Sequence, residues 1–266
     1  MLTRPLSLSR SLSRSLSLAA TLLAASTLPR LAAAQEQRAV THQYQSWFAV
    51  NFQGRVGGRF SLVGDAQYRA WDDFTPQTII ARTAVVFHFT DRLFAGVGYM
   101  WQPTWRARGP EGFIDEHRIY QVLQYEYAHA GSGLTVQLRT RFEQRFRHPT
   151  ADVELGLRAR QMVRAMLPIT ADRKLRLVAW DEVFLNLIDS GNAPRGLDAA
   201  GAPTRTPQWA FTGFDQNRAF LGLGYQFIPN LLRVELGYLN VYVRRPNNGG
   251  DLMSHIAQIQ VFTGWR

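Results

Sequence analysis

Apolar and polar residues alternate along most of the chain with a period of two. Between Leu134 and Phe146, apolar side chains recur at every second position, interrupted only by Thr140 and Gln144. The positions between them carry polar and charged residues, which are Gln137, Arg139, Arg141, Glu143 and Arg145. A β-strand places successive side chains on opposite faces, whereas a helix would scatter these groups around its axis. The pattern therefore predicts a strand with one apolar and one charged face.

The same sorting recurs in segments that are spread over the chain. In one of them, Leu155 and Val163 share one face, and Arg158 and Arg164 share the other. Most segments have about 10 residues or more, the length that a tilted transmembrane strand needs, whereas strands of soluble proteins typically have about 5–6. The predicted strands are residues 44–53, 59–69, 78–89, 93–101, 116–127, 134–146, 153–167, 174–187, 216–227, 232–244 and 254–265.

Aromatic residues gather near the ends of these segments. Such positions are typical of the two aromatic girdles of a membrane barrel. A soluble β-sandwich with aromatic edges is the alternative, but it would have to present an arginine-rich face to water in strand after strand. The girdle residues are Tyr44, Trp47, Tyr68, Trp71, Tyr99, Trp101, Tyr125, Tyr127, Tyr225, Phe227, Tyr238, Tyr242 and Trp265.

Short and long connections alternate between the segments, as periplasmic turns and extracellular loops do in outer-membrane barrels. If the short connections are periplasmic, the first segment starts outside, and an even number of strands needs one more strand, at Gln37–Gln43. The predicted fold class is all-β, an antiparallel transmembrane β-barrel of about 12 strands, with 10 strands as the alternative. The long connection from Asp189 to Phe214 is expected to be a mobile extracellular loop or a constriction that folds into the pore.

The N-terminal segment has the features of an export signal. Arg4, Arg10 and Arg14 form a basic region, Leu16–Leu28 is a short apolar region, and Ala32–Ala34 supplies a small-residue cleavage site. We therefore expect a signal peptide at residues 1–34 and a barrel at residues 35–266, located in the outer membrane of a Gram-negative bacterium. No later stretch is apolar for 18 residues, which argues against a helical membrane protein.

The charge balance is basic, but its distribution matters more than its size. Because four arginines and no acid precede the expected cleavage point, the net charge falls from +10 for the whole chain to +6 for the mature part. A basic balance often indicates nucleic acid or anionic lipid. Here the arginines fall on the polar faces of the predicted strands, so nucleic acid is not an expected partner. The expected partners are outer-membrane lipid with lipopolysaccharide and a small anionic solute.

The polar faces together predict an arginine-rich lumen. Arginine and carboxylate side chains can pair with directional, bidentate hydrogen bonds at low dielectric. One interpretation is that they pair across strands and fill a narrow barrel; the other is a positively biased channel or pocket for anions. The candidate lumen charge network consists of Glu116, Arg118, Arg139, Arg141, Glu143, Arg145, Arg158, Arg160, Arg164, Glu182 and Arg218.

Signatures of catalysis and of metal binding are poor. Ser254 and His255 are adjacent in the sequence, and so are Glu116 and His117. Neighbours on one strand point to opposite faces, so neither pair forms a direct nucleophile–base contact. The absence of cysteine excludes disulfides and thiolate metal sites, and no histidine spacing indicates a metal or another cofactor. The pattern favours a structural or small-solute pore; a lipid-modifying enzyme or a barrel that binds ligands through its loops are the alternatives.

Asp181 departs from the pattern. The alternation from Leu175 to Leu187 places its carboxylate on the lipid face, beside Glu182 in the lumen. A carboxylate at mid-bilayer is costly. We therefore expect a β-bulge at Asp181–Glu182 that turns the carboxylate inward, or a position near the interface.

Five sequence blocks stand out along the predicted strands. They are Glu116-His117-Arg118-Ile119-Tyr120-Gln121, Arg141-Phe142-Glu143-Gln144-Arg145-Phe146, Asp181-Glu182-Val183-Phe184-Leu185-Asn186, Phe214-Asp215-Gln216-Asn217-Arg218 and Gly237-Tyr238-Leu239-Asn240-Val241-Tyr242. Together these blocks resemble a family of bacterial outer-membrane β-barrel proteins that carries the label domain of unknown function 2490 (DUF2490). The likeness extends from Trp47 to near Trp265, and single blocks are less specific than the set. The resemblance implies an outer-membrane barrel, but it brings no catalytic residue and no ligand.

Overall fold

The computed structural model describes residues 39–105, 113–148, 153–191, 194–197, 203–205, 208–245 and 250–265. These residues belong to one compact unit that begins at Ala39. The expected signal peptide, residues 1–34, lies outside the described residues. Among the described residues, no helix is long and apolar enough to cross a membrane.

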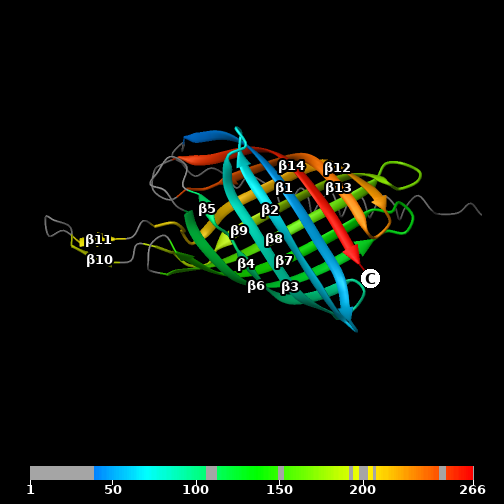
Figure 1. The fold of residues 1–266 in the computed structure, drawn as a ribbon, viewed down its shortest axis with the longest axis horizontal. Coiled ribbons are helices and arrows are strands. Elements are labelled where there is room, and N and C mark those ends of the chain that lie inside the picture. Colours follow the sequence, from blue (N-terminus) through cyan, green and yellow to red (C-terminus); the bar gives the residue numbers. More distant parts are fainter. Residues whose placement is uncertain are drawn as a thin grey trace, which may run out of the picture. The chain divides into compact units, whose positions relative to one another are not determined.

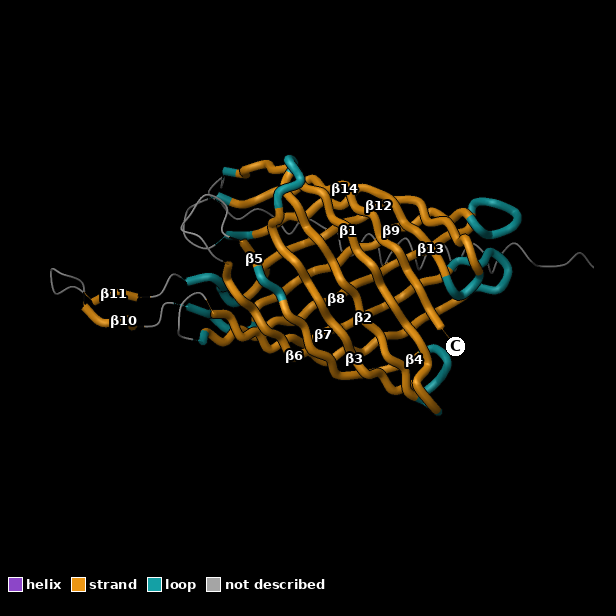
Figure 2. Tube along the Cα trace, in the orientation of Figure 1, coloured by secondary structure: helices purple, strands orange, loops and turns teal. Residues whose placement is uncertain are grey.

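Long tilted strands form a closed β-barrel (Figures 1 and 2). Eleven strands close the barrel through pairing of β2 with β3, and β10 pairs with β11 in a separate hairpin. The strands are β1 (Val40–Gly57), β2 (Phe60–Trp71), β3 (Pro76–His88), β4 (Leu93–Trp101), β5 (Thr104–Trp105), β6 (Phe113–Ala128), β7 (Thr135–His148), β8 (Glu154–Pro168), β9 (Leu175–Asn186), β10 (Pro194–Leu197), β11 (Pro203–Arg205), β12 (Gly213–Ile228), β13 (Leu232–Val243) and β14 (Asp251–Trp265).

The structure confirms the predicted all-β barrel of about 12 strands, with two changes: one pair of neighbouring strands is parallel, and the strands are counted differently. All eleven segments predicted from alternation are strands of the barrel, and the twelfth strand of the sheet is the two-residue β5. β5 pairs with both β3 and β6, so it continues β4 beyond Pro103. The separate strand expected at Gln37–Gln43 is wrong, because from Val40 onward these residues belong to β1. Residues 37–44 contain no Gly, Pro, Asn or Asp to form the tight turn that a separate strand would need.

The barrel closes through a parallel pair of strands. β1 runs parallel to β14, with a register from Val40↔Asp251 to Gly54↔Trp265, whereas the other neighbours in the barrel are antiparallel. An odd number of strands requires this arrangement, because the first and the last strand then run in the same direction. β1 therefore begins at the end of the barrel opposite to the end at which β14 finishes.

The two ends of the barrel differ in their connections. At one end, which we call the turn end, the connections are tight, and four of them contain a residue with positive φ, which are Gly58 (50°), Gly133 (68°), Arg173 (58°) and Asn230 (60°). At the other end, which we call the loop end, the connections include residues 102–112 and 187–212. The predicted alternation of short and longer links is therefore present only in part, because the links between β2 and β3 and between β7 and β8 are also short.

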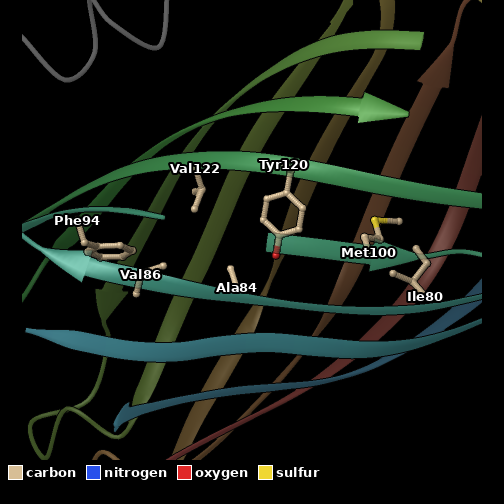
Figure 3. Packing of buried hydrophobic residues seen from close by; sticks show 7 residues of the cluster. All are labelled: Ile80, Ala84, Val86, Phe94, Met100, Tyr120 and Val122. Carbon is tan, nitrogen blue, oxygen red and sulfur yellow. The ribbon is translucent and has the colours of Figure 1, made fainter. Parts of the chain in front are cut away.

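The distribution of apolar and charged side chains between the outer and inner faces of the barrel is the reverse of that between the surface and the core of a soluble protein. Large apolar side chains such as Val97, Phe142 and Leu221 are exposed on the outside, with exposed fractions of 58%, 48% and 57%. Inside, two apolar clusters line opposite parts of the wall. One lies on β3, β4 and β6 and is drawn in Figure 3; the other lies on β1, β9 and β12–β14. Trp47, which the sequence placed in a girdle, belongs to the second cluster and is only 5% exposed, because odd positions of β1 face inward.

Asp181 lies on the outer face, and no bulge turns it inward. β9 pairs with β8 in continuous register through Asp181 and Glu182, and the bulge in this region is on β12, between Phe214 and Gln216. The carboxylate of Asp181 instead accepts hydrogen bonds from Asn217 Nδ2 at 3.0 and 3.1 Å. The expectation of a bulge at Asp181–Glu182 is therefore wrong; a cross-strand amide satisfies the carboxylate on the outer face.

Candidate functional site

A charge network fills the middle of the barrel interior, and Glu143 lies at its centre. This carboxylate is 1% exposed and accepts hydrogen bonds from three guanidinium groups. Arg160 Nη1 donates to it at 2.5 Å, Arg158 Nη2 at 2.6 Å and Arg118 Nη1 at 3.3 Å. β6, β7 and β8 are neighbours in the sheet, so inward-facing positions on them meet at this point. Burial of a carboxylate at this depth requires such compensation.

Two further carboxylates extend the network to either side of Glu143. Glu116 accepts bonds from Arg145 Nε and Nη2 at 2.7 and 3.2 Å, and from Arg118 Nε at 2.6 Å. On the other side, Glu182 accepts bonds from Arg160 Nη2 at 2.8 Å and from Arg139 Nη2 at 3.0 Å. We call these residues the lumen network; its members are Glu116, Arg118, Arg139, Glu143, Arg145, Arg158, Arg160 and Glu182.

The bulge on β12 supplies a fourth carboxylate. Asp215 occupies the irregular position between Phe214 and Gln216, and its Oδ2 accepts a bond from Arg158 Nη1 at 3.3 Å. A bulge aims a side chain differently from its neighbours. Here it brings a carboxylate to an arginine of the network.

Three arginines at the middle of the lumen have no acidic partner among the described residues. Arg69 lies over the ring of Trp47 at 3.7 Å, and Arg218 lies over the same ring at 5.4 Å. Arg141 lies over the ring of Tyr120 at 4.5 Å. Cation–π contacts of this kind contribute less than a bidentate carboxylate does. The interior of the described barrel therefore carries a local excess of positive charge.

The structure brings together most of the residues that the sequence assigned to the lumen. Eight of the eleven form the lumen network, Arg141 and Arg218 line the same interior without an acidic partner among the described residues, and Arg164 lines the larger cavity outside the network. Arg164 pairs with Glu235, which also accepts a bond from Arg233 Nε at 2.9 Å. The function of these residues stays a prediction.

Sequence reasoning missed several residues of this interior. Asp65 and Arg69 on β2 both face inward, and Asp65 pairs with Arg82, whose Nη2 donates to it at 3.0 Å. The alternation Ser61, Val63, Asp65, Gln67, Arg69 carries this signal, but the mixed residue types weaken it. Trp47 was missed because its position near a strand end suggested a girdle.

Two cavities lie within the barrel on either side of its middle. The larger, about 610 Å³, extends toward the turn end, where Arg55, Asn230 and Thr263 line it. The smaller, about 220 Å³, extends toward the loop end, where Gln43 and Ser254 line it. Five residues line both cavities, and they are Trp47, Arg69, Arg82, Arg160 and Arg218.

Trp209 from the long connection between β9 and β12 reaches the inner wall near the loop end. Its ring lies over Arg145 at 4.6 Å and over Arg147 at 5.2 Å. A Cβ at Gly156 would come within 2.4 Å of Cη2 of Trp209, so the absence of a side chain there leaves room for the ring. A bridge between Ser190 and Ala210 holds the two arms of the connection together. The described part of this connection therefore fits the constriction rather than the mobile loop.

Serine and histidine meet at two places among the described residues. Ser61 Oγ lies 2.9 Å from Nε2 of His88 inside the barrel, and His129 Nδ1 lies 3.0 Å from Ser132 Oγ in an exposed turn. Among the described residues, no carboxylate is hydrogen-bonded to the first pair, and the second pair is part of the hydrogen bonding of the turn. Ser254 faces inward and accepts a bond from Gln43 at 2.7 Å, so it does not contact His255 on the outer face, as the alternation predicted.

The fold and its interior define a closed β-barrel with an arginine-rich lumen. The family model "Protein of unknown function (DUF2490)" matches residues 44–252, and the chain belongs to this family, as the sequence blocks predicted. An uncharacterized protein of Methylorubrum extorquens is 30% identical over 220 residues, which cover 82% of this chain and 86% of the relative. No solved structure matches the chain.

Proposed function

We propose that the protein is an integral outer-membrane β-barrel that provides a narrow, anion-biased passage for small solutes. The observation that carries this proposal is the inverted distribution of side chains. Apolar residues such as Val85, Leu123 and Leu236 are about half exposed on the outside (52%, 49% and 57%), while Glu143 and Glu235 inside are at most 1% exposed. Soluble monomers rarely expose a contiguous apolar surface larger than a few hundred Å².

Polar aromatic groups at the loop end support a position at a membrane–water interface. On the outer face, Tyr99 bonds His117 Nδ1, and His117 Nε2 lies 3.0 Å from Asp115 Oδ2. On another part of that face, Tyr238 bonds His255 Nδ1 at 2.6 Å, and His255 Nε2 lies 2.9 Å from His42. Side chains with an apolar body and a polar tip suit the boundary between lipid and water.

The passage would be narrow because the lumen network occupies the middle of the barrel. Arg160 and Arg218 line both cavities, so a solute moving from one cavity to the other would pass guanidinium groups. Those groups favour anions over cations, since Arg69, Arg141 and Arg218 have no acidic partner among the described residues. Trp209 would restrict access further at the loop end.

Four measurements test the proposal. The protein should fractionate with the outer membrane and migrate differently in gels before and after heating, and an epitope inserted at Gly201 should be accessible on intact cells. In planar bilayers, the purified protein should give small, anion-selective currents, and Trp209→Ala should enlarge them. A protein that stays in the soluble fraction would overturn the membrane assignment; cation selectivity would overturn the proposed passage.

A further inference from the structure

We infer that the larger cavity of the barrel is a binding site for an amphipathic organic anion. The anionic group would be held by Arg69 and Arg141 at the middle of the barrel, and the apolar body would lie against Val86, Phe94 and Val122. This inference deepens the proposed function, on which it rests, because it names the class of solute that the lumen accepts.

Arg141 is the most direct indication of a charged ligand. Its side chain lines the larger cavity, and the residue is 7% exposed. Among the described residues, no carboxylate lies within salt-bridge distance of it, and its Nε and Nη1 have no hydrogen-bond acceptor. Arg69 resembles it, since it is 9% exposed, lines the same cavity and has no acceptor for Nε. A buried cation without a partner is costly, and an anion in the cavity would remove that cost.

The atoms that lack a partner around the cavity are mostly donors. Besides Arg69 and Arg141, Arg139 Nε and Trp180 Nε1 have no acceptor, whereas Gln258 Oε1 is the one acceptor without a donor among the cavity's described lining. A ligand that satisfied these groups would have to bring acceptor atoms. Carboxylate and phosphate groups do so with geometry that matches a guanidinium fork.

The wall of the cavity indicates that the ligand also has an apolar part. Val86, Phe94 and Val122 are at most 7% exposed and line the cavity next to Tyr120, as Figure 3 shows for their cluster on β3, β4 and β6. Met162 and Phe262 line the cavity as well, from β8 and β14. The lumen of a water-filled barrel is ordinarily polar. A bare inorganic anion could pair with the arginines but would gain nothing from the apolar wall, so the wall indicates a ligand with an apolar part.

The size and the entrance of the cavity agree with a small organic molecule. A volume of about 610 Å³ lies within the range of about 300–1,000 Å³ that is usual for small-molecule sites. Toward the turn end, polar side chains such as Gln124 and Asn230 line the cavity together with apolar ones such as Phe94 and Leu232. A ligand that enters from that end with its anionic group first would reach the arginines while its apolar body lies against the apolar wall.

The test measures binding to the full chain in a neutral detergent by equilibrium dialysis, with detergent alone as the blank. The probe is 4-phenylbutyrate, and the comparators are the neutral 4-phenylbutanamide and inorganic phosphate. We expect 4-phenylbutyrate to bind at least about tenfold more tightly than either comparator, because charged hydrogen bonds and apolar burial both contribute. Arg141→Gln should weaken its binding at least about tenfold.

Arg59→Gln is the matched control, because Arg59 is exposed at the turn end, lies outside both cavities and undergoes the same chemical change. It should leave binding unchanged. Arg69→Gln replaces Arg141→Gln if the latter does not fold. Phosphate binding as tight as that of 4-phenylbutyrate would overturn the amphipathic class, and so would tight binding of the neutral amide. Absence of saturable binding to folded protein would overturn the site itself, while fractionation and bilayer currents would still report separately on the proposed function.

Discussion

Replacement of Glu143 by Gln should destabilise the barrel strongly while it changes the shape of the side chain very little. Glu143 accepts four hydrogen bonds from Arg118, Arg158 and Arg160, and it is 1% exposed. A glutamine keeps one acceptor oxygen but turns an NH₂ group toward guanidinium donors. Three arginines then lose a shared counter-charge in a region that water reaches poorly.

The magnitude follows from the cost of breaking one partner of a buried pair, which is about 3–5 kcal/mol. Within the lumen network, five arginines face three carboxylates in the native protein, and two carboxylates would remain after the substitution. An opposing contribution is the free-energy cost of desolvating the native carboxylate, which a neutral glutamine avoids. Because the arginines stay buried and charged, we expect the loss of compensation to dominate.

Urea unfolding of the protein in lipid vesicles measures the free energy of unfolding. Glu126→Gln is the matched control, because Glu126 is exposed near the turn end, accepts a bond from Gln124 and has no arginine partner in the part of the chain that the structure describes. The control should shift the free energy of unfolding by less than about 0.5 kcal/mol. Adding Arg158→Gln to Glu143→Gln should recover part of the loss, which a double-mutant cycle would quantify.

One result would refute the reasoning. If Glu143→Gln unfolds at the same urea concentration as the native protein, then water screens the arginines and the middle of the lumen is wide. In that case anion selectivity in planar bilayers should rise, since one negative charge has been removed. Unchanged stability together with no current would refute both the packed network and the channel, and would favour binding through the loops.

Three further predictions concern other parts of the barrel. Phe142→Arg should cost about 2–4 kcal/mol if Phe142 faces lipid near mid-depth, whereas Gln137→Arg, inside the larger cavity, should cost much less; equal costs in urea unfolding would contradict the assigned faces. Gly156→Val should displace the ring of Trp209, because a Cβ would already come within 2.4 Å of it, and the emission of that tryptophan should shift to longer wavelength relative to a Trp209→Phe reference; an unchanged spectrum would place the ring elsewhere. Hydrogen bonds from Thr170 Oγ1 and the backbone N–H of Lys174 lower the pKa of Asp172 below 3.8. The ionised carboxylate therefore stabilises the turn above that pH, and this stabilisation is lost as the pH falls through the lowered pKa. A titration midpoint of Asp172 at or above 3.8, measured by NMR, would contradict this.

Much of the barrel could be predicted from the sequence, because alternation is a local property. In β7 the inward positions Arg139, Arg141, Glu143 and Arg145 follow directly from the period of two, and the structure places all four inside. The strands that flank β7 were also predictable, since consecutive strands of a barrel with short links are neighbours. The sequence alone was therefore enough to predict the inner and outer faces of the strands and their approximate number.

The pairing of individual charges could not be predicted, because it depends on how far each side chain reaches across the interior. Arg139 and Glu182 are bonded although β8 lies between their strands, and no alternation rule selects that pair. Arg141, two residues from Arg139, is left without an acidic partner among the described residues. Such differences arise from register and curvature, which a pattern along one strand does not contain.

The parallel pair of β1 and β14, which we call the seam, could not be predicted because we assumed an even number of strands, as is usual for outer-membrane barrels. An even strand count was expected, so an extra strand was placed before Tyr44. Parallel pairs are slightly less stable per residue than antiparallel ones, and a slip of one residue would exchange the inner and outer faces of β1. Side chains offset that weakness: Gln43 Nε2 donates to Ser254 Oγ at 2.7 Å inside, and His42 lies 2.9 Å from His255 outside. Gln43 and Ser254 are a registered pair on the inner face, whereas His42 contacts His255 diagonally on the outer face. A slipped register would lose both contacts, so side chains specify the seam where no connecting turn can specify it.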